Sequence, residues 1–134
     1  MFRTAMQLWT DLATVGALLV YLGTLFYCGR QRARHGIQAP ATTGHPDYER
    51  ALRIQQNTLE NLVVFIPTLW MFSILVNPLV GAGLALVWIL ARAWYAISYA
   101  RAPETRGPGF IVAMVVVLVM LGSVLVQSVR YLPL

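Results

Sequence analysis

A cluster of polar side chains stands at the start of an apolar run in the middle of the chain. Arg53, Asn57 and Glu60 are separated by three or four residues, a spacing that places them on one face of an α-helix. Residues 62–66 are apolar, and neither Gly nor Pro separates the two parts. A carboxylate and hydrogen-bonding groups at the mouth of a membrane helix are costly, so they indicate a binding site. Gln55 points about half a helical turn away and therefore faces a different neighbour.

A second set of polar groups follows later in the chain. Arg92, Tyr95 and Tyr99 share one face of a further apolar run, and Arg106 stands in the polar stretch after it. Guanidinium groups bind carboxylates in a bidentate manner, so the expected ligand is small, polar and carries more than one carboxylate. Glu60 suits an ammonium group on the same ligand. In the alternative interpretation, Glu60 and Arg92 pair with each other between helices and have only a structural role.

Composition places these residues in a membrane protein. The chain has 134 residues, of which 58% are hydrophobic and 11% are charged, against about 25% charged residues in a soluble domain. Four apolar stretches are long enough to cross a bilayer, which takes about 20 residues. They cover about residues 8–28, 58–76, 79–99 and 110–127. We predict a single all-α domain over residues 1–134, built as a four-transmembrane-helix bundle, in which the first stretch is an uncleaved span rather than a signal peptide.

The connections between the spans are polar. We predict loops at Gly29–Pro46 and Ala100–Gly109, and a tight turn at Asn77–Pro78. Residues 47–56 are expected to extend the second span as a helix above the membrane. Because the chain crosses four times, the first and third connections lie on the same side.

Arginine residues determine the predicted orientation. The side of the first and third connections holds seven of them: Arg30, Arg32, Arg34, Arg50, Arg53, Arg101 and Arg106. The other side holds Arg3 and Arg130. This bias places both connections in the cytoplasm, with the chain in the bacterial inner membrane, or in the endoplasmic reticulum membrane of a eukaryote. The net charge of +5 thus serves orientation, and no nucleic-acid partner is expected.

Several kinds of chemistry lack the residues they need. Cys28 is the only cysteine, and His35 and His45 are the two histidines. Cys28 has no metal-ligand spacing around it, and we expect both histidines to be solvated in the first loop. No metal site, phosphate loop or protein nucleophile is predicted. The reactive group is therefore expected to arrive with the ligand.

Short motifs follow one another between about residues 30 and 110. They are Thr42-Thr43-Gly44, Tyr48-Glu49-Arg50, Arg53-x-Gln55-x-Asn57-x-x-Glu60, Ala91-Arg92-x-x-Tyr95-x-x-x-Tyr99-Ala100-Arg101 and Arg106. Together they resemble the MAPEG superfamily, the membrane-associated proteins in eicosanoid and glutathione metabolism. The resemblance implies four-helix membrane proteins that assemble as homotrimers and bind glutathione between neighbouring subunits.

The resemblance also implies a role for each site residue. The residues expected to hold glutathione within one subunit are Arg53, Asn57, Glu60, Tyr95 and Tyr99. Arg32 and Gln55 would come from the adjacent subunit, and Arg106 matches the arginine beside the glutathione sulfur. The implied activity is a glutathione transferase or peroxidase, in which glutathione is the co-substrate and its thiolate attacks a lipophilic electrophile or a lipid hydroperoxide from the bilayer.

Two other functions stay open at this point. One is a non-enzymatic protein that binds lipids, of the lipoxygenase-activating type. The other is a small proton-coupled exporter with Glu60 as the carrier, although Glu60 lies near the interface rather than at mid-span. Within the family, Ala33 stands where the leukotriene synthase has a second arginine, which argues against that reaction. Asn61 replaces an aromatic hydroxyl of some members, which alters one ligand contact.

Overall fold

Four long helices form the molecule, in a computed structural model that describes residues 5–132. In order they are α1 (Ala5–Arg34), α2 (Pro46–Leu75), α3 (Pro78–Arg101), the short 3-10 helix η1 (Pro103–Thr105) and α4 (Gly107–Arg130). Each of the four α-helices is long and apolar enough to cross a membrane. The predicted all-α membrane bundle is therefore confirmed. Arg3, used above for orientation, lies outside the described residues.

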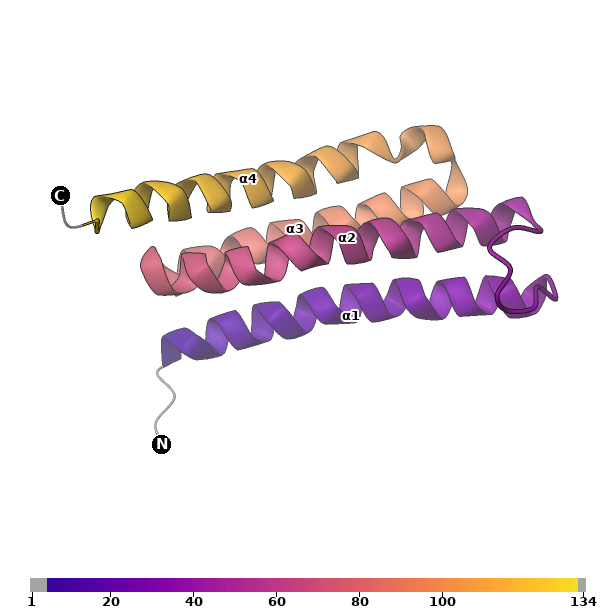
Figure 1. The fold of residues 1–134 in the computed structure, drawn as a ribbon, viewed down its shortest axis with the longest axis horizontal. Helices are drawn as coiled ribbons and strands as arrows, with labels where there is room; N and C mark the ends of the chain where they lie inside the picture. Colours follow the sequence, from indigo (N-terminus) through magenta and orange to yellow (C-terminus); the bar gives the residue numbers. More distant parts are fainter. Residues whose placement is uncertain (1–4, 133–134) are drawn as a thin grey trace.

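The helices run up and down beside one another (Figure 1). Both α2 and α3 occupy the centre, because α1 packs against α2 and α3, and so does α4. The α1–α2 and α3–α4 connections, residues 35–45 and 102–106, meet at one end of the bundle, which we call the charged end. The start of α1, the α2–α3 connection and the end of α4 lie at the other end, which we call the terminus end. The two connections thus share one end, as predicted, and the helix ends that they join carry most of the arginines counted above. The cytoplasmic orientation of this end stays a prediction.

The central helices begin with side-chain caps that the sequence explains. Pro46 opens α2 after His45, whose side chain accepts a hydrogen bond from the Asp47 backbone N–H. Pro78 opens α3 after Asn77, whose Oδ1 accepts from the Val80 backbone N–H at 2.9 Å. Proline fits the first helical position because that N–H has no helical partner. The predicted tight turn at Asn77–Pro78 is confirmed.

The prediction of a loop from Gly29 is wrong. Helix α1 continues to Arg34, so the first connection is shorter than expected. A glycine inside a helix costs only about 1 kcal/mol, so α1 continues through Gly29. The residue that turns the chain away after this end is Gly36, at φ +63°. The Gly36 N–H donates a hydrogen bond to the Ala33 carbonyl, and the Ile37 N–H donates one to the Arg32 carbonyl. Glycine tolerates this left-handed conformation and ends helices in this way.

The second loop is also shorter than predicted. Ala100 and Arg101 still belong to α3, and α4 already begins at Gly107. Between them, η1 turns the chain in three residues. The expected extension of the second span over residues 47–56 is confirmed, since α2 runs unbroken from Pro46 to Leu75.

Three close contacts hold α2 and α4 against α3. The Phe65 ring on α2 stacks on the Trp88 ring on α3, with centroids 4.1 Å apart. The buried Trp88 Nε1 donates a hydrogen bond to Asn61 Oδ1 at 2.8 Å. Nearer the charged end, Gly109 of α4 approaches α3 so closely that a Cβ there would meet the Tyr95 nitrogen at 2.7 Å. These contacts position α2 and α4 around the part of α3 that carries the candidate site.

Candidate functional site

A buried arginine lies at the centre of the predicted site. Arg92 on α3 is 0% exposed, and its Nη2 donates hydrogen bonds to Asn57 Oδ1 at 3.1 Å and to Thr58 Oγ1 at 2.7 Å. Its guanidinium carbon lies 4.1 Å from the centroid of the Tyr95 ring. Within the described part of the chain no ion pair joins Arg92 to Glu60. The alternative interpretation, in which these two residues pair with each other, is therefore wrong.

Aromatic contacts extend this cluster toward the charged end. The Tyr95 and Tyr99 rings meet edge to face with centroids 5.7 Å apart. The guanidinium of Arg106 lies 4.9 Å from the centroid of the Tyr99 ring. Asn57, Arg92, Tyr95, Tyr99 and Arg106 therefore form one continuous series, which we call the polar row. It begins on α2, follows α3 and ends at the residue that caps α4.

Two predicted ligand residues flank the polar row on α2. Arg53 and Glu60 are both exposed, and Arg53 is close enough to Tyr95 to act on it electrostatically. Beside them, a groove of about 240 Å³ opens between α2 and α4. The groove is lined by Asn57, Glu60, Asn61, Val64, Phe110, Met114 and Val117. It is polar where it meets the polar row and becomes apolar along the membrane-spanning parts of the helices.

The remaining two predicted residues lie where α1 packs against α2. Gln55 Nε2 donates a hydrogen bond to the Tyr21 hydroxyl at 3.2 Å. Arg32 on α1 donates to the Tyr48 hydroxyl and lies 4.7 Å from the centroid of that ring. The prediction that Gln55 and Asn57 face different neighbours is confirmed, since Gln55 contacts α1 whereas Asn57 contacts Arg92 of α3.

The predicted residues thus fall into two groups. One face of α2 and the facing parts of α3 and α4 hold a first set: Arg53, Asn57, Glu60, Tyr95, Tyr99 and Arg106. The α1 side holds Arg32 and Gln55. The first set is rich in guanidinium groups and hydroxyls, with one exposed carboxylate, which suits an anionic ligand that also carries an ammonium group.

Sequence reasoning missed several residues that position this site. Tyr21 and Tyr48 receive hydrogen bonds from Gln55 and Arg32, and no spacing rule connects such distant positions. Gly109 permits the close approach of α4 to Tyr95. The signal available was the Gly107-Pro108-Gly109 segment directly after Arg106, because glycine often marks a close backbone approach.

The expectation that both histidines are solvated is wrong for His35, whose side chain is 18% exposed, whereas the His45 side chain is 41% exposed. Their rings stack with centroids 3.5 Å apart and an interplanar angle of 12°. The sequence interval between them gave no sign of this, since the first connection folds back so that its two ends meet.

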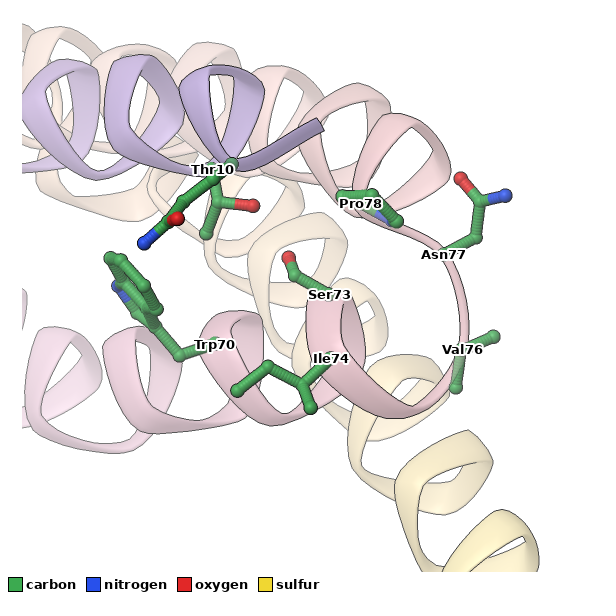
Figure 2. Close-up of a pocket in the computed structure, with 8 residues that line it drawn as sticks. Thr10, Trp70, Ser73, Ile74, Val76, Asn77 and Pro78 are labelled. Carbon is green, nitrogen blue, oxygen red and sulfur yellow. The ribbon is translucent and has the colours of Figure 1, made fainter. Parts of the chain in front are cut away.

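A larger pocket lies at the terminus end, away from every predicted site residue. Its volume is about 500 Å³, and Figure 2 shows Thr10, Trp70 and Ser73 around it. Its lining is uncharged and consists of Gln7, Thr10, Trp70, Ser73, Ile74, Val76, Asn77 and Pro78. These residues include no ionisable side chain that could activate the hydroxyls of Thr10 and Ser73, so the pocket does not supply the chemistry that the polar row can.

Residues 10–126 of the chain match the MAPEG family. The chain belongs to the MAPEG family. An uncharacterized protein of Synechocystis sp. is 48% identical over 103 residues, which are 77% of this chain and 75% of that protein. Microsomal glutathione S-transferase 2 of Mus musculus is 46% identical over 82 residues, which are 61% of this chain and 56% of that protein. Leukotriene C4 synthase of Cavia porcellus is 37% identical over 97 residues, 71% of this chain and 65% of that protein. The match thus covers less than two thirds of both mammalian MAPEG relatives.

Proposed function

We propose that this MAPEG protein is an integral membrane glutathione transferase that activates the glutathione thiol for attack on a lipophilic electrophile or a lipid hydroperoxide. The observation that carries the proposal is the polar row, which leads from Asn57 to an exposed guanidinium at Arg106. The names of two relatives, a glutathione S-transferase and a leukotriene C4 synthase, support glutathione-dependent transfer as the reaction class.

The ligand contacts follow from the charges of the site. In this proposal, Arg53 and Asn57 bind the carboxylate and amide groups of glutathione, and Glu60 binds its ammonium group. Tyr95 and Tyr99 position the peptide through their hydroxyls rather than transfer protons, since a phenol has a pKa near 10. Arg92 donates to Asn57 and so holds this amide in one orientation.

Arg106 is the proposed catalytic residue. A free thiol has a pKa of about 8.5, so little thiolate exists at neutral pH. A guanidinium beside the sulfur favours the anion and lowers the pKa of the glutathione thiol. With an electrophilic carbon, the thiolate forms a carbon–sulfur bond while the bond to the leaving group breaks and takes its electron pair with it. With a hydroperoxide, the thiolate attacks the terminal oxygen and the O–O bond breaks, so that the lipid leaves as an alkoxide that takes a proton from water. The sulfenic acid formed on glutathione then reacts with a second glutathione to give the disulfide and water.

The lipophilic partner has an obvious route to this sulfur. The groove between α2 and α4 is polar at Asn57 and Glu60 and apolar at Val64, Met114 and Val117. An amphiphilic substrate entering from the bilayer would place its tail along the apolar part and its reactive group beside the polar row.

We further propose that each complete site lies between two subunits of a homotrimer, with the charged end in the cytoplasm. Arg32 of α1 and Gln55 of α2 make their contacts between α1 and α2, while the polar row runs from α2 along α3 to the start of α4. One chain therefore carries two different half-sites at separate helix contacts. A ring of identical subunits brings such half-sites together, because a heterologous interface joins unlike patches.

The thiolate itself provides the direct test. Glutathione is added to the purified protein in detergent micelles, and the ultraviolet absorbance of the bound thiolate is recorded as a function of pH. We expect thiolate at neutral pH with the wild type, less by one to two orders of magnitude with Arg106→Ala, and partial recovery with Arg106→Lys. Since Arg106 is exposed, the Tm of the unliganded variants should not change. Equal thiolate in the wild type and Arg106→Ala would refute the role of Arg106, and binding without any thiolate would favour a non-enzymatic lipid-binding protein.

Complementation tests the shared site. Asn57→Leu damages one half-site and Arg32→Ala damages the other, so each variant alone should be inactive. Co-expressed in equal amounts, the two should recover about a quarter of wild-type activity by random assortment, because one interface in four then joins two intact halves. Lack of recovery in mixed oligomers that contain both variants would show that each chain forms its own complete site.

A further inference from the structure

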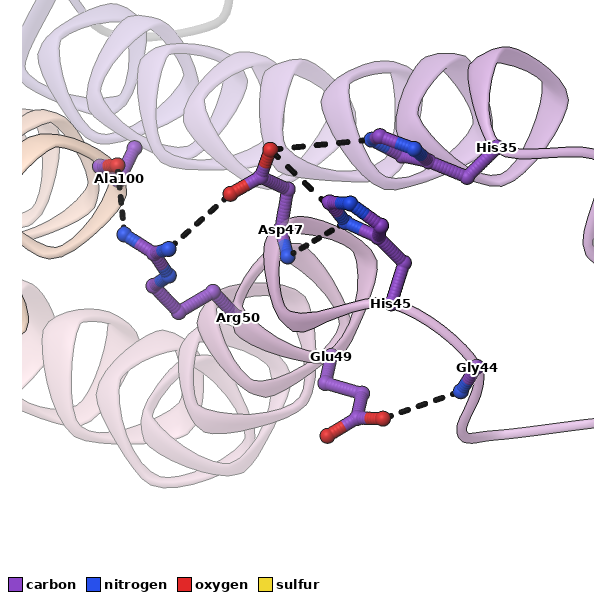
Figure 3. Close-up of polar contacts among 7 residues, drawn as sticks. All are labelled: His35, Gly44, His45, Asp47, Glu49, Arg50 and Ala100. Atoms are coloured by element: carbon purple, nitrogen blue, oxygen red, sulfur yellow. Dashed lines mark hydrogen bonds and ion pairs between the residues drawn. The ribbon is translucent and has the colours of Figure 1, made fainter.

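A compact group of metal-ligand side chains lies at the charged end, apart from the polar row. His35 follows the end of α1, His45 caps α2, and Asp47 belongs to the first turn of α2. One ligand atom from each lies within 4.8 Å of the others. Asp47 Oδ2 is 3.7 Å from His35 Nε2 and 3.9 Å from His45 Nδ1. Figure 3 shows both imidazole rings turned toward this carboxylate.

The carboxylate is held in place by a neighbouring cation. Arg50 Nη2 donates to Asp47 Oδ1 at 3.0 Å, and Arg50 Nη1 donates to the Ala100 carbonyl at 3.3 Å (Figure 3). These bonds occupy Oδ1 and leave Oδ2 directed at the histidines. Supporting hydrogen bonds of this kind orient the ligands in metal sites.

One ligand atom makes no hydrogen bond, although it faces the Asp47 carboxylate. His35 Nε2 is buried and makes no hydrogen bond in the described structure, and its 3.7 Å separation from Asp47 Oδ2 is too long for one. A buried nitrogen without a partner is unfavourable. A cation between the carboxylate and the two imidazoles would satisfy it.

We propose that His35, His45 and Asp47 bind one divalent transition-metal ion, of the Zn²⁺ class. Two imidazoles with one carboxylate suit Zn²⁺, Ni²⁺ or Cu²⁺ and are a poor set for Mg²⁺ or Ca²⁺, which prefer oxygen ligands. Tetrahedral ligands at about 2.0–2.2 Å from Zn²⁺ lie about 3.4 Å apart. The two carboxylate–imidazole separations of 3.7 and 3.9 Å need to close by only a few tenths of an ångström, and the ligand atoms of the two imidazoles, within 4.8 Å of each other, by at most about 1.4 Å. This proposal departs from the sequence-based expectation of no metal site.

Binding would change the local geometry in a defined way. The stacked rings direct their lone pairs nearly parallel, so one ring must tilt out of the stack to share an ion with the other. The metal would also replace the hydrogen bond that His45 Nδ1 accepts from the Asp47 N–H. The fourth position is open to water.

The ion would connect three helices at the charged end. Its ligands join the end of α1 to the start of α2, and Arg50 links Asp47 to the Ala100 carbonyl of α3. The α1–α2 connection also contains Ala41, whose carbonyl accepts a hydrogen bond from the Tyr48 hydroxyl. A bound metal would therefore stiffen the connection that surrounds Arg32 and Tyr48.

The experiment uses the full chain without a histidine tag, in detergent micelles and after removal of metal with a chelator. Micromolar Zn²⁺ should raise the Tm by about 5 °C or more at saturation, because the ion binds the folded state alone, while Mg²⁺ should not. Co²⁺ should give the intense visible absorption of a tetrahedral site. No Tm shift with Zn²⁺, or a weak octahedral Co²⁺ spectrum, would overturn the proposal.

Three substitutions test the ligands while keeping their structural roles. His35→Phe retains an aromatic ring in the stack, His45→Asn retains a helix-capping side chain, and Asp47→Asn retains the shape of the carboxylate. Each should abolish the Zn²⁺ shift. Cys28→Ser is the matched control, since it removes the only thiol and should leave the shift intact. A shift that persists in all three ligand variants would show adventitious binding elsewhere and refute the site.

Discussion

The two ends of the bundle differ in what they offer a ligand. The terminus end has the larger pocket, about 500 Å³, with an uncharged lining. The charged end has a groove of about 240 Å³ beside a series of guanidinium, hydroxyl and amide groups. Pocket size therefore favours the terminus end as the site of chemistry, whereas the side chains present favour the charged end. Of these two cavities, only the groove at the charged end lies beside guanidinium groups that can stabilise a developing anion, so volume alone is a poor guide to the site of chemistry in this fold.

The ends also differ in how their buried hydroxyls are used. At the charged end, Thr58 Oγ1 accepts a hydrogen bond from Arg92 and donates one to the Ile54 carbonyl. At the terminus end, Thr10 is 2% exposed and its Oγ1 has no partner in the described structure. The buried hydroxyl beside the polar row is thus used by another side chain, whereas the Thr10 hydroxyl is not. Arg92 itself keeps two buried nitrogens, Nε and Nη1, without a hydrogen-bond partner in the described structure.

The largest expected effect on stability comes from the α3–α4 contact at the charged end. Gly109→Ala would place a Cβ 2.7 Å from the Tyr95 nitrogen and 2.8 Å from the Ala91 carbonyl. Backbone must move, which costs about 1–3 kcal/mol, and the move displaces Tyr95. We expect a lower Tm in micelles and a smaller Tm increase on addition of glutathione.

Gly122→Ala is the matched control in the same helix. A Cβ at Gly122 would meet nothing within 4 Å, so the substitution should leave stability unchanged or raise it by up to about 1 kcal/mol, because alanine favours helices. Equal losses from both substitutions would mean that α4 is not held at Gly109 as described.

The next effect compares one substitution at the two ends. Thr58→Val removes the hydroxyl that accepts a hydrogen bond from the buried Arg92 guanidinium. This should lower the free energy of unfolding by about 1–3 kcal/mol and leave Arg92, which orients Asn57, less firmly held. Thr10→Val removes a hydroxyl that makes no hydrogen bond within the described residues, so the free energy of unfolding should stay the same or rise. Thermal unfolding with and without glutathione measures both. If Thr10→Val proved the more damaging of the two, the contrast between the ends would fail.

The smallest effect is expected at the terminus pocket. Trp70→Phe removes the hydrogen bond from Trp70 Nε1 to Thr14 Oγ1, 3.1 Å long, and should lower stability by about 1 kcal/mol. The Tm increase produced by glutathione should be the same as in the wild type. A loss of that increase would place ligand binding at the terminus end and contradict the proposed site.

Periodicity was enough to predict much of this structure. The four membrane helices, the turn at Asn77–Pro78 and the different directions of Gln55 and Asn57 all follow from local patterns. Such features depend on residues within one or two helical turns of each other. The composition of a short window therefore contains the necessary information.

The features that were missed depend on residues far apart in the chain. The Arg92 bonds to Asn57 and Thr58 cross from α3 to α2, and the stacked histidines meet only because the first connection folds back. The end of α1 was misplaced because Gly29 and Gly36 look alike in sequence, and only Gly36 takes a positive φ. Spacing rules give directions on a helix, but they do not say which neighbour occupies each direction.

The length of α1 has a consequence for access to the Arg32 half-site. With 30 residues, α1 is about 45 Å long, against a hydrocarbon thickness of about 30 Å. The apolar stretch of α1, about residues 8–28, spans about 31 Å and so matches that core. The last turns of α1, which carry Arg32, therefore project beyond the hydrocarbon. The extra length of α1 thus holds the Arg32 half-site out of the membrane interior, where a water-soluble ligand can reach it.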